Sequence, residues 1–444
     1  MSENYLNTKI NSFIAIFLGS AFFFLNLGIS IFYILSFFFI TYLWIKNLLR
    51  IDYVQKIFLF FLIYLILSNF LINYEIIDLK FFYKNLMYLK FLLLFLTLDI
   101  IFKNINLVKK ILFINFFFLI FLIFEVYLQR SIGYEILGYS IHSYNRVTGP
   151  YGEELVIGTL ILYVGFHSFF YFLINKKFKS KINEFFYFVI FFNLYFFSIY
   201  LTGERMNFLI SLLLITLMII ILYKHRLKLF LSTFIFFILI FLTFHFNLTV
   251  SDKYKTFADL IRLKDKITQT DSSKNIIYKK EDNLEIKNED KDNEKTYFHV
   301  LDAHLLHFSV AKEIWKDNKL FGAGVRSFQR ICGNYDYLET FNKSKSCSTH
   351  PHNFILELLA ETGLLGIGIF IFLIIYILIK NFKKLLKIIK VPENNIIIIS
   401  FLIIFIALIW PLKTSGRLFS NFYGTIFWFN FFTFYILLKR FKLK

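Results

Sequence analysis

Long apolar runs recur along almost the whole chain, and they constrain its fold more than any other feature. About twelve of them reach the roughly 17 residues that a helix needs to cross a bilayer. Inside lipid, every backbone polar group needs an internal partner, and continuous runs satisfy this only as helices. We therefore predict an all-α polytopic integral membrane protein. The predicted spans are roughly 11–27, 29–45, 57–73, 86–102, 110–128, 154–174, 185–201, 206–223, 229–248, 353–379, 395–411 and 419–438.

The composition agrees with this prediction. Of the 444 residues, 58% are hydrophobic, and a soluble domain of this length cannot bury so much apolar surface. The formal net charge is +19, but the charged residues lie between the apolar runs. This distribution argues against a nucleic-acid-binding protein. The first apolar run is followed at once by others, which argues against a cleaved signal peptide.

Lys and Arg concentrate in alternate loops and predict the topology. The basic loops lie near 46–56, 103–110, 176–181, 224–228 and 380–390, together with the tail 439–444. We therefore expect both termini on the cytoplasmic side. The segments expected to face outward are 129–153, 202–205, 249–352 and 412–418.

One long polar segment divides the chain. Residues 1–248 hold the first nine predicted helices, 353–444 hold the last three, and 249–352 form the loop between them. The middle of this loop, near 264–297, is rich in Lys, Asp, Glu and Asn and predicts a mobile charged insert. Apolar periodicity returns over 300–331, where we expect a helix on or near the membrane surface.

The chain has two cysteines, Cys332 and Cys347, and both lie in this loop. An oxidising compartment would allow a disulfide closing a loop of about 15 residues, worth roughly 3 kcal/mol. The alternatives are two free thiols or a metal pair with His350. Because two cysteines without CxxC spacing are a weak metal signal, we favour the disulfide and expect no metal site.

Arginine is distributed differently from lysine. The chain has 39 Lys and 10 Arg, and seven of the ten Arg fall in the segments expected to face outward. The planar guanidinium suits phosphate and carboxylate groups, so phosphate binding and salt bridges to residues such as Glu204 are both open. Arg146, Arg205 and Arg417 lie close to expected outward helix starts, which attract anions.

The strongest local signal for a functional site is the sequence THPHN at 349–353, just before a predicted helix. Pro351 suits the first helical turn, which would place His352 at the outer end of that helix. A neutral His there can act as a general base, or it can simply cap the helix. Glu357 and Glu361 follow on one helix face. Carboxylates so deep are usually paired or functional, and pairing of Glu357 with an outward Arg is the alternative.

His352 and Asn353, followed by Gly363 and Gly366, match the pattern H-[NSQ]-x9-G-x-x-G, which resembles the signature of O-antigen ligases and related O-antigen polymerases. The two glycines are also small enough to let another helix approach closely. Three further segments are similar to stretches of that family. They are LFGAGVRSF at 320–328, LTGER at 201–205 with Glu where Ser is usual, and RVTGPY at 146–151 without the usual Pro-Asn after it.

The resemblance implies a GT-C-like glycosyltransferase of a bacterial inner membrane, with its active site on the periplasmic face and 249–352 as a periplasmic loop. It also implies transfer of a glycan from an undecaprenyl-diphosphate donor to a hydroxyl of lipid A–core. The implied single displacement inverts the anomeric carbon and uses no metal, nucleotide sugar or other cofactor.

The resemblance also implies roles for individual residues. The arginines expected to hold the donor diphosphate are Arg146 and Arg205, with Arg326 and Arg417 as weaker candidates. His352 is expected to deprotonate the acceptor hydroxyl, with His350 as the fallback base. The residues expected to support the site are Glu204, Asn353, Glu357, Gly363 and Gly366.

Several alternatives stay open on the sequence. A polymerase would use a second lipid-linked repeat as its acceptor; the large outward loop and the complete His–Gly pattern favour the ligase. A transferase acting on protein hydroxyls is a third possibility. A lipid-linked glycan transporter would need charged residues inside many spans, whereas these spans consist largely of Phe, Ile and Leu. Membrane lipid is an expected partner in every case, and nucleic acid is not.

Overall fold

The computed structural model describes residues 3–72, 79–142, 145–176, 178–246, 248–251, 254, 306–332, 348–411 and 416–440. Within these ranges the chain is helical, with no β-strand and two isolated β-bridges. Seven described segments are long and apolar enough to cross a membrane. They are Lys9–Ile45, Tyr53–Ile72, Ile105–Ile132, Ile157–Asn175, Lys181–Leu201, Tyr223–His245 and Phe354–Lys390. The chain is therefore an α-helical polytopic membrane protein, and the count of about twelve spans stays a prediction.

Helices occur in each predicted range. Up to Asn175 they are α1 (Glu3–Ala21), α2 (Leu25–Ile45), α3 (Tyr53–Ile72), α4 (Leu79–Leu86), α5 (Lys90–Ile101), α6 (Ile105–Ile132), α7 (Ile157–Leu160) and α8 (Phe166–Asn175). After it they are α9 (Lys181–Leu201), α10 (Arg205–Ile221), α11 (Arg226–His245), α14 (Ser327–Ile331), α16 (Phe354–Lys390), α17 (Ile396–Leu408) and α18 (Phe422–Arg440).

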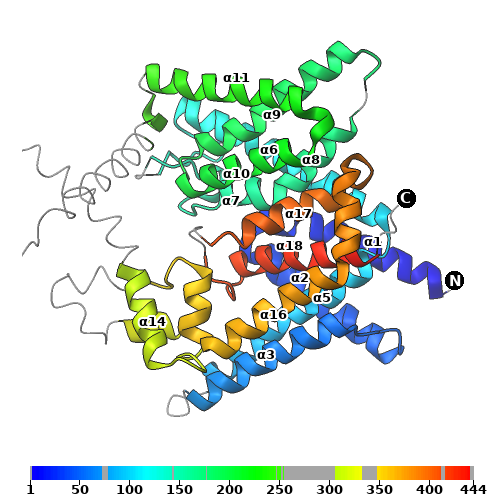
Figure 1. Cartoon of the computed structure of the whole chain (residues 1–444), viewed down its shortest axis with the longest axis vertical. Coiled ribbons are helices and arrows are strands. Elements are labelled where there is room, and N and C mark those ends of the chain that lie inside the picture. Colours follow the sequence, from blue (N-terminus) through cyan, green and yellow to red (C-terminus); the bar gives the residue numbers. More distant parts are fainter. Residues whose placement is uncertain are drawn as a thin grey trace, which may run out of the picture.

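The loops expected to be basic and the segments expected to face outward lie at opposite ends of the helices. Lys439 pairs with Asp52, and Arg440 pairs with Asp99. At the other end, Val147 N–H donates to Thr202 O at 3.0 Å. Figure 1 shows α14 at one end and the two chain termini at the other. We call the end formed by 145–152, 202–205, 306–332, 348–353 and 416–420 the site end.

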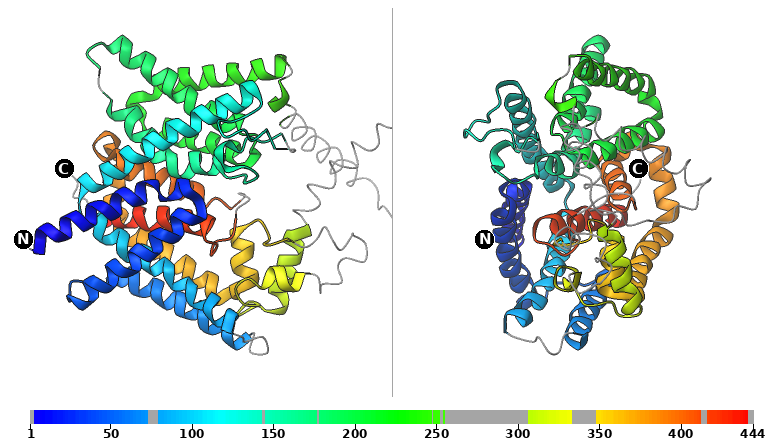
Figure 2. Two further views of the ribbon diagram at one scale, coloured as in Figure 1. Left: turned by 180° about the vertical axis from the view of Figure 1, so that it is seen from behind. Right: turned by 90° about the vertical axis from the view of Figure 1, so that its left-hand side faces the viewer.

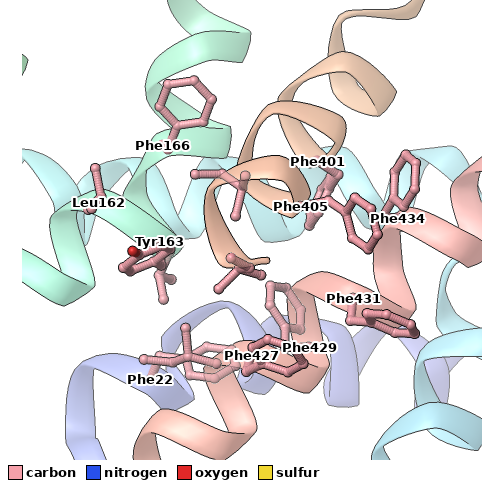
Figure 3. Close-up of a cluster of buried hydrophobic side chains, with 14 of the residues drawn as sticks. Phe22, Leu162, Tyr163, Phe166, Phe401, Phe405, Phe427, Phe429, Phe431 and Phe434 are labelled. Atoms are coloured by element: carbon pink, nitrogen blue, oxygen red, sulfur yellow. The ribbon is translucent and has the colours of Figure 1, made fainter. Parts of the chain in front are cut away.

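Helix α18 forms the centre of the molecule. Almost every residue from Phe422 to Leu438 is buried, as expected for a helix that is apolar all round. The views in Figure 2 place α18 near the centre of the molecule, where it packs against α5 and α17. Aromatic rings fill the space around it: Phe434 of α18 stacks on Phe405 of α17 with ring centroids 4.7 Å apart, and Phe429 lies 5.0 Å from Phe22 (Figure 3).

A small polar network crosses this aromatic core. The His167 ring nitrogens lie 3.1 Å from Ser400 Oγ and 2.6 Å from Asn430 Oδ1. Asn430 also donates to the carbonyl of Tyr163 at 3.2 Å. That carbonyl lies in a π-helical turn, Ile161–Gly165, between α7 and α8, and such turns release carbonyls from the regular helical ladder. The network therefore fixes α8, α17 and α18 to one another within an otherwise apolar region.

Helix α16 has a kink at Gly363, where the backbone adopts φ 64° and ψ −168°, a conformation open essentially to glycine alone. The segment 319–324 pairs with the interrupted helix as a strand would. Leu364 and Leu365 N–H donate to the carbonyls of residues 319 and 320 at 2.8 and 3.1 Å. Residues 323 and 324 donate to the carbonyls of 360 and 361 at 2.9 and 3.0 Å. We call this paired arrangement the Gly363 clasp.

The sequence predicted that another helix approaches both Gly363 and Gly366, and the structure agrees only at Gly366. A Cβ at Gly363 would lie 2.4 Å from the backbone of Leu320, so its close neighbour is a non-helical segment and not the predicted helix. A Cβ at Gly366 would lie 3.1 Å from Tyr64 of α3, where a second helix does approach. The Tyr64 hydroxyl donates to Thr362 O at 2.7 Å and fastens α3 to the kink.

The predicted helix over 300–331 is interrupted. Residues 306–317 are helical, a non-helical stretch follows, and α14 begins at Ser327. The interruption lies where 319–324 joins the clasp, because a continuous helix could not offer its N–H groups to α16. Both pieces pack on the start of α16 through a small apolar cluster that includes Ile314, Phe328 and Ala360. The predicted insert at 264–297 lies outside the described residues.

A Gly363→Ala variant tests the clasp. The added Cβ meets backbone atoms at 2.4 Å in a conformation unfavourable for alanine, so we expect a loss of about 1–3 kcal/mol or more. The measurement is the melting temperature of the purified protein in detergent. Gly368→Ala is the matched control in the same helix, because a Cβ at Gly368 has nothing within 4 Å. Equal melting temperatures for the two variants would contradict the clasp.

Candidate functional site

Two of the predicted arginines flank one tight turn at the site end. Gly203 has φ 75°, and a Cβ on it would lie 2.9 Å from Asn145 O and 3.7 Å from Arg146 Cα. The backbone at 145–147 therefore packs directly on the turn that precedes Arg205. Arg130, which the sequence leaves out of the site, braces this contact by donating to Leu201 O at 2.6 Å and to Asn145 Oδ1 at 2.7 Å.

Glu204 lies between these arginines and makes contacts of its own. Its Oε1 accepts from Gly158 N–H at 2.9 Å, and its other oxygen contacts the Asn207 amide. Burial raises the pKa of Glu204 to about 7, although the Gly158 hydrogen bond and the nearby charge of Arg146 act in the opposite direction. Glu204 is also the N-cap residue of α10. Thr202, two residues earlier, belongs to the end of α9.

The histidine segment precedes α16 and does not form its first turn. The Asn353 side chain accepts from Ile355 and Leu356 N–H at 3.0 and 3.1 Å, so Asn353 is the N-cap and the helix begins at Phe354. The prediction that Pro351 lies in the first helical turn is therefore wrong. Asn353 also donates to Pro411 O at 2.8 Å, which ties the segment to the chain after α17.

Three histidine rings lie together just above this cap. The ring centroids of His350 and His352 are 4.2 Å apart, and those of His307 and His352 are 5.4 Å apart. His307 comes from the helical stretch 306–317 and is buried, with its ring edge-on to Phe328. His352 itself has φ 56°, an unusual conformation for a residue with a side chain that the surrounding structure must hold in place.

Arg417 bridges two parts of the site end. Its Nη2 donates to Gln329 Oε1 of α14 at 3.2 Å and to the carbonyl of Thr349, next to His350. The following residue, Leu418, donates its N–H to Glu357 Oε2 at 3.1 Å. Arg417 therefore contacts the histidine segment directly.

Arg326 lies at the start of α14 with φ 65°. The Glu361 carboxyl group lies next to the backbone of Arg326 and Phe328. Glu357 and Glu361 are both buried, and Arg326 and Arg417 lie near both carboxyl groups. These four residues therefore form one connected group around the first two turns of α16.

A cavity of about 60 Å³ lies where α7 and α10 meet the ends of α16, α17 and α18. Arg417 lines it, whereas Arg146, Arg205 and His352 do not, so their convergence on one pocket stays a prediction. The described lining residues are Thr159, Tyr163, Asn207, Phe354, Leu408, Gly416, Arg417, Leu418, Tyr423, Ile426 and Phe427.

Sequence reasoning missed the polar residues of this lining. Asn207 is one helical turn after Glu204, and Thr159 and Tyr163 are four residues apart in an otherwise apolar run. Polar side chains that share a face within such a run were the available signal. His307 was missed too, although a histidine within the apolar periodicity of 300–331 carried a similar signal.

Of the two cysteines, the structure describes Cys332. Cys332 is buried and disulfide-bonded, and Cys347 lies outside the described residues, so their pairing stays a prediction. Among the residues that the structure describes, no group of three or more His, Cys, Asp or Glu side chains is placed to hold a metal ion.

Comparison with known proteins agrees with the motifs. A family model described as O-Antigen ligase matches residues 189–371. This range contains the turn before Arg205, the segment that joins the clasp, and the His–Gly pattern. No curated protein matches the chain. Over residues 189–371, the chain is therefore similar to the O-antigen ligase family.

Proposed function

We propose that the chain transfers a glycan from an undecaprenyl-diphosphate donor to an acceptor hydroxyl at the periplasmic face of a bacterial inner membrane. The observation that carries this proposal is that arginines from four separate segments lie at the same end of the helices as a histidine pair. A lipid diphosphate presents two anionic groups at the membrane surface, and guanidinium groups bind such groups bidentately.

Arg146 and Arg205 are the proposed ligands of the donor diphosphate. They flank the same turn, and Glu204 between them is held by Gly158 and Asn207. During transfer the bond from the anomeric carbon to the diphosphate breaks, and the leaving group takes the electron pair. Guanidinium groups fixed beside that oxygen would stabilise the developing charge without a metal ion. Arg326 and Arg417 are the weaker candidates for the same task.

His352 is the proposed general base. Its imidazole would accept the proton of the acceptor hydroxyl while the hydroxyl oxygen attacks the anomeric carbon. A single displacement of this kind inverts the configuration at that carbon. The ring of His350 lies 4.2 Å from that of His352, between centroids, and His350 is the fallback base.

The proposed acceptor is lipid A–core, which makes the chain an O-antigen ligase. A polymerase that extends a second lipid-linked repeat is the alternative within the family, and both would use the same donor chemistry. In either case we propose about twelve spans and cytoplasmic termini, because the basic loops lie at the end opposite the candidate site.

Replacing Arg205 or His352 by Ala should abolish transfer in a reconstituted assay with a lipid-linked glycan donor. The first change removes diphosphate binding and the second removes the base, so we expect a rate loss of roughly 100-fold or more in each case. The measurement is the amount of glycosylated acceptor formed by folded, membrane-inserted protein.

Arg226→Ala is the control for these two variants. Arg226 is exposed at the opposite end, where it donates to the carbonyl of Ile219 in α10, so its loss should leave transfer unchanged. Full activity of Arg205→Ala or His352→Ala, with normal insertion, would contradict the proposed roles.

Donor binding should depend on the protonation of Glu204. Because its pKa is raised to about 7, Glu204 is largely neutral below that pH and leaves the charge of Arg146 uncompensated. Above that pH the carboxylate is anionic and repels the diphosphate. We expect the donor KM to rise between about pH 6 and pH 8 and this rise to flatten in Glu204→Gln. A steeper or identical pH dependence in the variant would argue against the assignment.

A lipopolysaccharide gel distinguishes the two acceptors. In a deletion strain, loss of all glycan-capped core is expected for a ligase, because no repeat reaches lipid A–core. A product with a single repeat would instead identify a polymerase.

A further inference from the structure

The first two turns of α16 carry two buried carboxylates that the proposed chemistry does not use. Glu357 and Glu361 are 3% and 2% exposed, and they lie one turn apart on the same face of the helix. Buried carboxylates of this kind are costly unless hydrogen bonds compensate them. Their hydrogen-bond partners therefore indicate what the two residues do.

Each carboxyl group lies against the backbone of a different loop, and each of these loops carries an arginine. Glu357 accepts from Leu418 N–H at 3.1 Å, which fixes the backbone beside Arg417. The Glu361 carboxyl group lies next to the backbone of Arg326 and Phe328, at the start of α14. A backbone N–H that donates to a buried carboxyl oxygen offsets the cost of burying both groups.

The contacts continue beyond the first loop to the histidines. Arg417, held through its neighbour by Glu357, donates to the carbonyl of Thr349 and to Gln329 of α14 at 3.2 Å. Thr349 directly precedes His350, and its hydroxyl lies 2.8 Å from His350 Nδ1. A chain of contacts thus leads from Glu357 through Arg417 to the segment that holds His352 with φ 56°.

The second loop is fixed from two sides. Residues 323 and 324 already pair with the carbonyls of 360 and 361 in the Gly363 clasp. The Glu361 side chain lies just beyond these bonds, next to the backbone of Arg326 and Phe328. The backbone and the side chain of one short helical stretch therefore both lie against the loop that carries Arg326.

We propose that Glu357 and Glu361 are positioning residues on one face of α16. Glu357 fixes the loop of Arg417 and, through it, the histidine segment. Glu361 fixes the loop of Arg326. This inference rests on the proposed transferase function. It assigns the carboxylates no contact with substrate and no proton transfer. It also assigns Arg417 to the support of the histidine segment in preference to diphosphate binding.

The two carboxylates should affect different kinetic constants. Glu357→Leu removes the acceptor of Leu418 N–H and loosens the histidine segment, so we expect a roughly 10- to 100-fold lower kcat with the donor KM little changed. Glu361→Leu loosens Arg326, so we expect a higher donor KM. Glu→Gln at either position keeps an acceptor oxygen and should retain activity within a few-fold of the unchanged chain.

Hydrogen–deuterium exchange of the full chain in detergent provides a readout that needs no activity. Glu357→Leu should speed amide exchange at 416–420, and Glu361→Leu should speed it at 326–328, whereas both Gln variants keep the original protection. Asp99→Leu is the matched control, because Asp99 is a buried carboxylate paired with Arg440 at the opposite end. It should alter neither segment and neither kinetic constant.

Two results would overturn the inference. The first is a folded Leu variant with unchanged kinetics and unchanged exchange. The second is equal inactivity of the Gln and Leu variants with normal exchange, which would mean that the carboxylates act in the reaction itself. Failure of the proposed function is separate, since it would appear as absent transfer by the unchanged chain or as full activity of Arg205→Ala.

Discussion

The backbone pairing at Gly363 is the constraint on which the candidate site depends. A helix that crosses a membrane normally satisfies all its own hydrogen bonds, but the kink in α16 leaves donors and acceptors that need partners. The segment 319–324 supplies them, with four hydrogen bonds of 2.8 to 3.1 Å. Because this pairing needs backbone contact at Gly322 and Gly363, with both residues at positive φ, the glycines of the two sequence motifs act as two halves of one structural device.

The sequence predicted the helices well and their ends poorly, for a physical reason. Apolar length determines where a helix must cross lipid, and no tertiary information is needed to see it. Helix ends depend on which polar group satisfies the free N–H groups. At α16, two helix-start signals compete two residues apart: Pro351 favours the first turn, and Asn353 favours the N-cap position. The structure uses Asn353.

Other errors could not have been avoided from one sequence. The interruption of the predicted helix over 300–331 depends on acceptors in α16, about forty residues later in the chain. The approach of Arg146 to Gly203 depends on the packing of a loop against a turn. Motif order indicated that these residues belong to one site, but only the fold shows that Arg417 contacts the histidine segment and that Glu361 lies next to the backbone of Arg326.

Supporting such a site from within a membrane favours charged acceptors. Loops that meet at a bilayer boundary carry backbone N–H groups with reduced access to water, and an unsatisfied N–H group there is costly. A carboxylate can accept several such groups at once, and nearby guanidinium groups compensate its charge. Glu357 accepts from Leu418 N–H, and Arg326 and Arg417 lie near both Glu357 and Glu361. The cationic groups that suit an anionic substrate thus also lower the free-energy cost of burying the carboxylates that hold those groups in place.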